Sequence, residues 1–298
     1  MENNKITIII PTFNRANIIR KTLESIAAQS FQNWECIVVD DHSTDSTREI
    51  IDAYSKDDAR FKYMLNERKK GAQGARNTGL YNSSSEWVLF FDSDNQLQPD
   101  CLQELVAGIK TDVDVVQCFS RVINLENRKV EKYFRWCNYG IIHDHLFIGT
   151  SYVDFNHSII RRSKLLEIGG LDEDCPSMQE WDTHMRLSKI ASYNTVEKVL
   201  VDYFVGARDA ISTDNKKAIK GRLYNLEKFI QDWRLHKIGL CRFVYIYCIL
   251  ISRVQDKQFK EDSFKKMDDL VVYRKLYALF GFFINKWYAL QNYLVNNK

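Results

Sequence analysis

Two kinds of apolar periodicity alternate over the first 95 residues, and this alternation constrains the fold more than any other feature of the sequence. Short runs rich in β-branched and aromatic residues are typical of strands, whereas apolar residues that recur every three or four positions are typical of helices. The expected strands are residues 5–10, 34–39, 61–65 and 87–91, and the expected helices are 19–30, 46–54 and a shorter one within 71–82. Strands and helices that alternate in this way form βαβ units, so the sequence predicts a mostly parallel sheet covered by helices.

Two carboxylates follow the fourth expected strand. Asp92 and Asp94 stand two apart on nearly extended backbone, so their side chains can point the same way. In open parallel sheets, ligands bind outside the carboxyl ends of the strands. Neighbouring carboxylates repel each other unless a cation lies between them, and a divalent ion that also binds substrate phosphates suits that place. An isolated Asp-x-Asp sequence, however, is more often a pair of solvated loop acids.

Beyond residue 95 the pattern predicts a helix over 101–109, strands over 113–119 and 154–160, and a helix over 180–187. Acidic residues in the first turn of that last helix are favoured by the helix macrodipole, so Glu180 and Asp182 have a structural explanation as well as a functional one. The aromatic stretch 122–150 is left unassigned. Three glycines between residues 71 and 79 fit neither the dinucleotide-binding pattern nor the P-loop pattern, which disfavours both of those nucleotide-binding classes.

The charge of the chain is divided unevenly. Residues 215–298 carry 17 Lys and Arg against 7 Asp and Glu, whereas residues 1–214 carry 25 against 32. A mildly acidic body therefore precedes a strongly basic segment, which suggests separate partners for the two parts. The seven cysteines form no C-x-x-C pair, so neither a structural zinc site nor a disulfide framework is expected. With no signal-like N-terminal segment, and with an apolar run at 243–251 too short to span a bilayer, we expect a cytoplasmic chain.

Six segments of the chain, in order and spacing, resemble the family-2 glycosyltransferases of the GT-A fold. They are Ile8–Arg15, Val38–Thr47, Gly74–Leu80, Phe90–Asp94, Ile168–Glu173, and Glu180–Asp182 with Arg186 and Leu187 after it. The match extends over residues 5–205, and six motifs in register are far more specific than one Asp-x-Asp pair. The resemblance implies a three-layer α/β/α GT-A catalytic domain over 1–210, with a nucleotide-binding half at 1–110 and an acceptor-binding half at 111–210. A helical C-terminal region would follow at 211–298.

The resemblance also implies a reaction, namely inverting transfer of a sugar from a nucleotide sugar, usually UDP-linked, with Mn²⁺ or Mg²⁺. The product would belong to surface polysaccharide, O-antigen or glycolipid synthesis. The residues that it assigns to the nucleotide sugar are Pro11, Thr12, Phe13, Asn14, Asp41, Arg76, Asp92, Ser93 and Asp94. Asp41 would face the base, and Arg76 would lie near the base or the diphosphate. Asp92 would lie near the ribose and the metal, and Asp94 would be the direct metal ligand.

An inverting displacement also needs a base that removes the proton of the acceptor hydroxyl on the face opposite the leaving group. The family usually has Glu-Asp or Asp-Asp at this position, whereas the chain has Gln179-Glu180. By register the resemblance assigns the base to Glu180, with Asp182 as the competing candidate. Phe13 stands where the family commonly has Tyr, so an aromatic face is kept and a hydroxyl is lost.

Two other classes of protein remain as alternatives. A sugar-phosphate nucleotidyltransferase would be expected to have a Gly-rich loop after the first strand, where this chain has Pro-Thr-Phe-Asn. A non-catalytic nucleotide-sugar-binding protein would not need the acids at 92, 94 and 180. His157 is expected to be structural, with a contact to the diphosphate or acceptor as the less favoured interpretation. Arg208 and Ser212 are placed to reach the diphosphate from a loop.

The basic C-terminal segment contains an apolar stripe at helical spacing. Its members are Leu276, Tyr277, Phe280, Phe283, Ile284, Trp287, Leu290 and Leu294, with Lys275 and Lys286 among them. Such a stripe either lies on an anionic membrane, peripheral to its inner face, or packs against the catalytic domain or a second copy in a homodimer. Packing is the favoured interpretation. No nucleic-acid-binding motif accompanies the charge, so nucleic acid is not an expected partner.

Overall fold

The computed structural model describes residues 4–149, 151–206, 215–271 and 274–296, with the backbone alone at 276, 287, 288 and 290–296. By its contacts the chain divides into two compact units. The first comprises Met1–Ile142, Val153–Glu173 and Thr183–Arg208, and the second comprises His143–Tyr152, Asp174–Asp182 and Asp209–Lys298. The predicted division at residue 210, and the two halves within 1–210, stay predictions. Arg208 and Ser212 lie outside the described residues, as do the side chains of Leu276, Trp287, Leu290 and Leu294.

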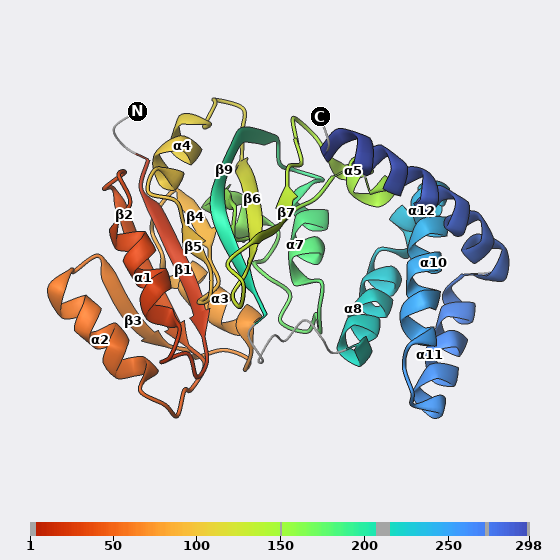
Figure 1. Ribbon diagram of the computed structural model, residues 1–298, viewed down its shortest axis with the longest axis horizontal. Helices are drawn as coiled ribbons and strands as arrows, with labels where there is room; N and C mark the ends of the chain where they lie inside the picture. Colours follow the sequence, from red (N-terminus) through yellow and green to blue (C-terminus); the bar gives the residue numbers. More distant parts are fainter. Residues whose placement is uncertain (1–3, 150, 207–214, 272–273, 297–298) are drawn as a thin grey trace. The chain divides into compact units, whose positions relative to one another are not determined.

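The first unit is built on a nine-stranded sheet with strand order β3-β2-β1-β4-β8-β6-β9-β5 and with β7 beside β6 (Figure 1). The amino-terminal strands β1 Ile6–Thr12, β2 Trp34–Asp40, β3 Phe61–Leu65 and β4 Trp87–Phe90 are parallel to one another. The helices that connect them are α1 Ile19–Ala27, α2 Thr47–Asp57 and α3 Ala72–Asn82. The βαβ pattern predicted for the first 95 residues is therefore confirmed.

The rest of the sheet mixes strand directions. Its strands are β5 Gln96–Leu97, β6 Val115–Asn124, β7 Val130–Phe134, β8 Ser158–Arg161 and β9 Tyr193–Val205. β8 runs antiparallel to both β4 and β6, while β9 runs parallel to β6. The helices of this part are α4 Cys101–Ala107, α6 Arg162–Glu167 and α7 Gln179–Leu187. The predicted strand 154–160 was wrong at its start, because residues 154–157 form a turn before β8.

The three glycines near α3 serve backbone geometry and packing. Gly71 has φ +122°, a conformation that glycine adopts without steric cost. A Cβ on Gly74 would lie 1.8 Å from the carbonyl oxygen of Lys69, and one on Gly79 would lie 2.5 Å from Cγ2 of Ile9 on β1. The α3 helix therefore packs closely on the sheet, where β1 contributes fully buried isoleucines. These glycines need no phosphate loop to explain them.

The second unit is helical. Its helices are α5 His143–Ile148, α8 Asn215–Lys228, α9 Ile230–Leu235, α10 Lys237–Ser252, α11 Lys257–Leu270 and α12 Arg274–Asn296, together with the first residues of α7. Stacked and edge-on rings of Phe147, Trp181 and Trp233 form part of its interior. The helical character predicted for the basic segment is confirmed. Within the described ranges, no helix combines the length and apolar content needed to cross a membrane.

Candidate active site

Polar side chains from several elements meet at one edge of the sheet in the first unit. Because β1 to β4 are parallel, their carboxyl ends lie at the same edge. β8 runs antiparallel to β4, so the turn at 154–157 that precedes it lies at this edge as well. Of the predicted residues, Pro11 and Thr12 end β1, and Phe13 and Asn14 follow it. Asp41, Asp92 and Asp94 follow the ends of β2 and β4. The turn adds Asn156, which the sequence did not predict.

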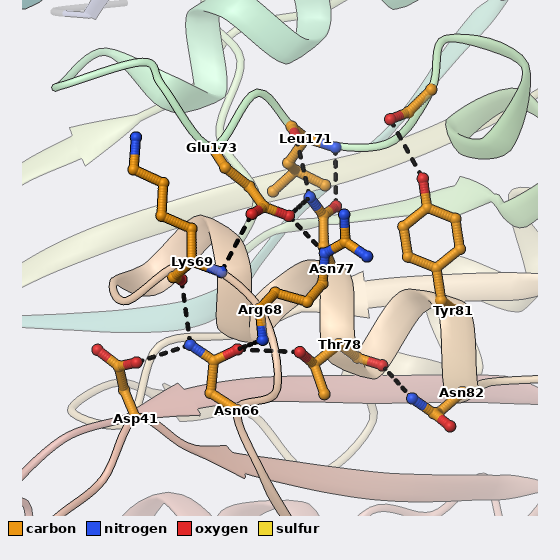
Figure 2. Close-up of polar contacts among 11 residues, drawn as sticks. Asp41, Asn66, Arg68, Lys69, Asn77, Thr78, Tyr81, Asn82, Leu171 and Glu173 are labelled. Carbon is orange, nitrogen blue, oxygen red and sulfur yellow. Dashed lines mark hydrogen bonds and ion pairs between the residues drawn. The ribbon is translucent and has the colours of Figure 1, made fainter.

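Asp41 is buried, and both of its carboxylate oxygens accept hydrogen bonds; Figure 2 shows the one from Asn66. The amide of Asn66 donates to Oδ1 at 2.6 Å, and the backbone N–H of Gly71 donates to Oδ2 at 2.8 Å. The oxygen of the Asn66 amide accepts from the Thr78 hydroxyl at 3.0 Å and from the backbone N–H of Arg68 at 3.0 Å. These bonds fix which way the amide faces, so Asn66 holds the Asp41 carboxylate in one orientation.

The segment 168–173, one of the six family-like motifs, is anchored to the same region (Figure 2). The side chain of Asn77 on α3 accepts from the backbone N–H of Leu171 and donates to its carbonyl, both at 2.9 Å. Glu173 accepts from Asn77 at 2.7 Å and from Arg68 Nε at 2.5 Å. Burial raises the pKa of Glu173, but the hydrogen bonds from Arg68 and Asn77 outweigh it and hold this pKa below its ordinary value. The motif therefore holds the loop that follows β3 in place, through the contact of Glu173 with Arg68.

The loop after β1 exposes an aromatic ring. Asn14 has φ +52°, and its side-chain oxygen accepts from the backbone N–H of Thr44 at 2.8 Å, which ties this loop to the one after β2. Phe13 keeps 44% of its surface exposed, and Lys70 Nζ lies 5.1 Å from the ring centroid. The buried hydroxyl of Thr12 has no hydrogen-bond partner within the described part of the chain. The loop therefore exposes a ring face, and the end of β1 beside it holds a buried hydroxyl for which the described residues provide no partner.

Asp92 is held from two sides. Arg76 Nη2 donates to its Oδ1 at 2.7 Å, and the amide of Asn156 donates to its Oδ2 at 2.8 Å. The oxygen of the same amide accepts from the backbone N–H of Asp92 at 2.7 Å. Arg76 is only 4% exposed, and its guanidinium lies 5.1 Å from the centroid of the Phe155 ring. The pair is therefore rigid, and the charge of Asp92 is balanced by a buried arginine.

Asp94 differs from Asp92, because among the described residues no side chain hydrogen-bonds or ion-pairs with its carboxylate. The side chain of Asp94 is exposed. Protein atoms around the carboxylate nevertheless displace part of its hydration shell, and this desolvation raises the pKa of Asp94. The negative charge of Asp92 raises that pKa further, while Arg15 lowers it. Both raising effects would be relieved by a cation, and carboxylate oxygens are ligands that hard divalent ions prefer. Ser93, between the two acids, is buried.

The residues present fit a metal ion that is shared with a substrate. No cluster of three or more His, Cys, Asp or Glu side chains able to hold a metal occurs within the described ranges. Asp92 and Asp94 alone would leave most of the coordination sphere to other oxygens. Magnesium-type ions in phosphate-binding enzymes are commonly held by one or two carboxylates, with phosphates and water completing the shell. The donor set therefore suits a nucleotide diphosphate complex better than an all-protein metal site.

A buried polar cluster lies behind Asp92. Asn156 donates to Asp154 at 3.0 Å, and Asp154 also accepts from the Tyr203 hydroxyl. His157 is 2% exposed, and burial lowers its pKa although Asp154 opposes the shift. His184 lies 2.9 Å from the Tyr193 hydroxyl, and burial lowers its pKa to about 3. At neutral pH the imidazole of His184 is therefore uncharged, and the burial of His157 favours its structural interpretation.

The two candidate bases lie in the second unit, at the start of α7, and they have different surroundings. Asp182 is fully buried, and Lys228 Nζ donates to its Oδ1 at 2.5 Å. Glu180 is partly exposed. The sequence offered no sign of the Lys228 contact, because the two residues are 46 positions apart.

Comparison with known proteins identifies the class of this chain. Residues 7–169, more than half of the chain, match the family model described as Glycosyl transferase family 2. The chain therefore belongs to this family of transferases.

Two of the curated relatives are named as glucosyltransferases. The chain is 42% identical over 103 residues to GalNAc(5)-diNAcBac-PP-undecaprenol beta-1,3-glucosyltransferase of Campylobacter jejuni, a match that covers 34% of this chain and 33% of that protein. It is 40% identical over 95 residues to UDP-Glc:alpha-D-GlcNAc-diphosphoundecaprenol beta-1,3-glucosyltransferase WfgD of Escherichia coli, covering 32% of this chain and 37% of that protein. The matches thus span about a third of the relatives' length.

Solved structures share the fold at low sequence identity. TarS 1-349 of S. aureus, in complex with UDP-GlcNAc, has a TM-score of 0.60 at 18% identity over 91% of this chain and 89% of that chain. The mannosyltransferase PcManGT of Pyrobaculum calidifontis, in complex with GDP-Man and Mn²⁺, has a TM-score of 0.63 at 16% identity over 95% of this chain and 86% of that chain. The predicted GT-A fold with a helical C-terminal region is therefore confirmed.

Proposed function

We propose that the chain is a metal-dependent, inverting glycosyltransferase that moves a sugar from a nucleotide sugar, UDP-linked by preference, to a hydroxyl of a glycan or lipid-linked acceptor. The product would belong to a surface polysaccharide, an O-antigen or a glycolipid. The observation that carries the proposal is the exposed Asp94 carboxylate beside Asp92, which Arg76 and Asn156 hold in place. The undecaprenol-linked compounds in the names of two relatives support a lipid-linked acceptor.

The nucleoside is assigned to the residues around Asp41. Its carboxylate, oriented by Asn66, is an acceptor for an N–H group on the edge of a pyrimidine base. The half-exposed ring of Phe13 offers an apolar face on which a base can stack. The orphaned Thr12 hydroxyl is available to the nucleoside. Pro11 and Asn14 shape the strand end on either side of these two residues.

The metal is assigned to Asp94, with Asp92 beside it. Asp92 has both oxygens engaged by Arg76 and Asn156, so Asp94 is the better direct ligand. When bound, Mn²⁺ or Mg²⁺ stabilises the negative charge that develops on the leaving diphosphate. The contribution of Arg76 and Asn156 is to keep Asp92 fixed, so that little reorganisation is needed when a substrate binds.

The general base is assigned to Glu180. An acceptor hydroxyl must reach the base, and Glu180 is partly exposed whereas Asp182 is buried. The ion pair with Lys228 occupies Oδ1 of Asp182. Glu180 would accept the proton of the hydroxyl as the oxygen attacks the anomeric carbon. The donor sugar inverts its configuration at that carbon, and the nucleoside diphosphate leaves.

Slow hydrolysis of nucleotide sugars tests this proposal without knowledge of the acceptor. We expect the purified chain to release UDP from at least one of UDP-glucose, UDP-N-acetylglucosamine and UDP-N-acetylgalactosamine when Mn²⁺ is present. Treatment with EDTA should stop the release, and added Mn²⁺ should restore it. A sugar-phosphate nucleotidyltransferase would instead form UTP from a UDP-sugar and pyrophosphate. Metal-dependent binding of UDP without turnover of any donor, even with lipid-linked acceptors, would indicate the non-catalytic alternative.

Replacing Asn66 by Ala is expected to raise the KM for the donor by about 10-fold to 100-fold while changing kcat little. A hydrogen bond to a charged group contributes roughly 1.5–3 kcal/mol, and loss of this one frees the Asp41 carboxylate to rotate. Donor kinetics would be measured for the variant and for Asn82→Ala. Among the described residues the Asn82 amide donates to the Thr78 carbonyl of the same helix and to no other group, so it is a matched control. An unchanged KM at a melting temperature equal to that of wild type would remove Asp41 from the nucleoside site.

A further inference from the structure

The helix α12 exposes a row of large apolar side chains that the proposed reaction does not use. Leu279, Phe280 and Phe283 keep 56%, 54% and 62% of their surfaces exposed. Lys275 and Lys286, at the two ends of this row, are exposed as well. We call these five residues the α12 face. Three neighbouring exposed apolar side chains between lysines are unlike the scattered single apolar residues of an ordinary surface.

The α12 face lies opposite the side by which α12 packs on α10. Gly281 is buried, and a Cβ there would lie 2.0 Å from the Cys241 carbonyl oxygen on α10. Four residues later, Asn285 accepts from Arg242 Nε at 3.3 Å. Successive helical residues are about 100° apart around the axis, which puts residues 275, 279, 283 and 286 on the side away from 281 and 285. Contact with α10 therefore leaves the α12 face uncovered.

The charge around this face restricts what can cover it. Neither α10 nor α12 contains an Asp or Glu residue. Their cations are Lys237, Arg242, Arg274, Lys275 and Lys286, and of these Arg274 is ion-paired with Asp268 on α11. A second copy of the chain, seated face to face, would bring the same positive charges together and would be repelled. An anionic bilayer surface offers both an apolar layer for the leucine and phenylalanine side chains and negative headgroups for the lysines.

We propose that α12 lies along the surface of an anionic membrane. Leu279, Phe280 and Phe283 enter the boundary between headgroups and acyl chains, while Lys275 and Lys286 bind lipid phosphates from either end of the row. Long lysine side chains can keep their stems beside the apolar residues and their ammonium groups at the headgroups. The binding does not depend on sugar transfer, although it would bring the chain to the surface in which a lipid-linked acceptor is held.

Flotation with vesicles of stated composition tests the membrane surface. The chain should bind vesicles that contain phosphatidylglycerol at low salt, bind pure phosphatidylcholine vesicles at least about tenfold more weakly, and be released by high salt. The double variant Leu279→Ser/Phe283→Ser should lose about tenfold or more in affinity for the anionic vesicles. The double variant Lys257→Ser/Lys265→Ser removes two charges from α11 and should bind within about twofold of wild type, because α12 is unchanged. Melting curves would establish that each variant is folded.

Three outcomes would overturn the proposal. The first is no binding of the wild-type chain to anionic vesicles at low salt. The second is an equal loss of binding in the α11 variant, which would indicate general attraction by the basic segment. The third is a dimer that the Leu279→Ser/Phe283→Ser variant converts to a monomer, since the α12 face would then be a subunit interface. Hydrolysis of a UDP-sugar in solution needs no membrane, so failure of vesicle binding and failure of the proposed function can be told apart.

Discussion

Replacing Asp94 by Ala is expected to lower the rate of donor turnover by about 10³-fold or more and to remove its dependence on Mn²⁺. Among the described contacts Asp94 has no side-chain partner, so the substitution breaks no ion pair and should leave the fold intact. It removes a carboxylate whose pKa is raised by desolvation and by the negative charge of Asp92, two effects that a bound cation would relieve. UDP release at several Mn²⁺ concentrations, together with calorimetric binding of UDP with and without Mn²⁺, would measure the effect.

Asp100→Ala is a matched control for Asp94→Ala. Asp100 is exposed, precedes α4 and makes no side-chain capping hydrogen bond. The control should leave turnover and the Mn²⁺ response within about twofold of wild type. The metal assignment would be wrong if Asp94→Ala kept a normal Mn²⁺ response, or if wild-type UDP binding were the same with EDTA as with Mn²⁺. If Asp94→Ala and wild type bind UDP equally weakly without Mn²⁺, the loss of activity in the variant comes entirely from lost metal binding.

The sequence predicted the amino-terminal half of the sheet because its information there is local. Each buried parallel strand is a continuous apolar run, and each covering helix has its own period, so both can be recognised without knowing what they pair with. The order of strands and the antiparallel direction of β8 depend on pairing between distant segments, which no periodicity encodes. The turn at 154–157 was mistaken for strand because Phe155 continues the apolar pattern of Ile159 and Ile160.

Within the candidate site, the sequence pointed to the acids that follow strands. It did not point to the asparagine side chains that hydrogen-bond to those acids. Asp41, Asp92 and Asp94 stand directly after apolar runs, and carboxylates in that position are uncommon enough to suggest a site. Asn66 and Asn156 follow or precede strands too, but asparagine is ordinary in turns, so position alone does not set them apart. Their importance comes from hydrogen bonds across 25 and 64 positions of the chain, to Asp41 and Asp92 respectively.

The C-terminal stripe shows a different limit of sequence reasoning. A helical period reveals that apolar residues share a side of the helix, but it does not reveal whether that side is covered. Packing was the favoured interpretation, yet Phe280 and Phe283 are exposed while Gly281 and Asn285 adjoin α10. The contact with α10 depends on a glycine, which an apolar stripe does not include. For this reason we favour a membrane surface over packing as the partner of this part of α12.

Replacing Glu180 by Gln is expected to lower transfer to the acceptor by about 10²-fold to 10⁴-fold while leaving the affinity for UDP and Mn²⁺ unchanged. The amide cannot accept the proton of the acceptor hydroxyl, but it has nearly the size of the carboxylate. Glu180→Asp should retain more transfer than Glu180→Gln, because a carboxylate is preserved. Transfer would be followed with whichever acceptor the donor screen identifies, and UDP affinity by calorimetry.

Asp182→Asn separates a chemical role from a structural one. Asp182 is buried and bound to Lys228, so neutralising it removes this ion pair, and the melting temperature should fall. The loss of stability is moderated because 27% of the Lys228 side-chain surface is exposed, so water can solvate its ammonium group. If Glu180 is the base, Asp182→Asn lowers stability more than it lowers transfer per folded molecule, and Glu180→Gln does the reverse. The opposite pattern would assign the base to Asp182 and leave Glu180 a structural residue in the first turn of α7.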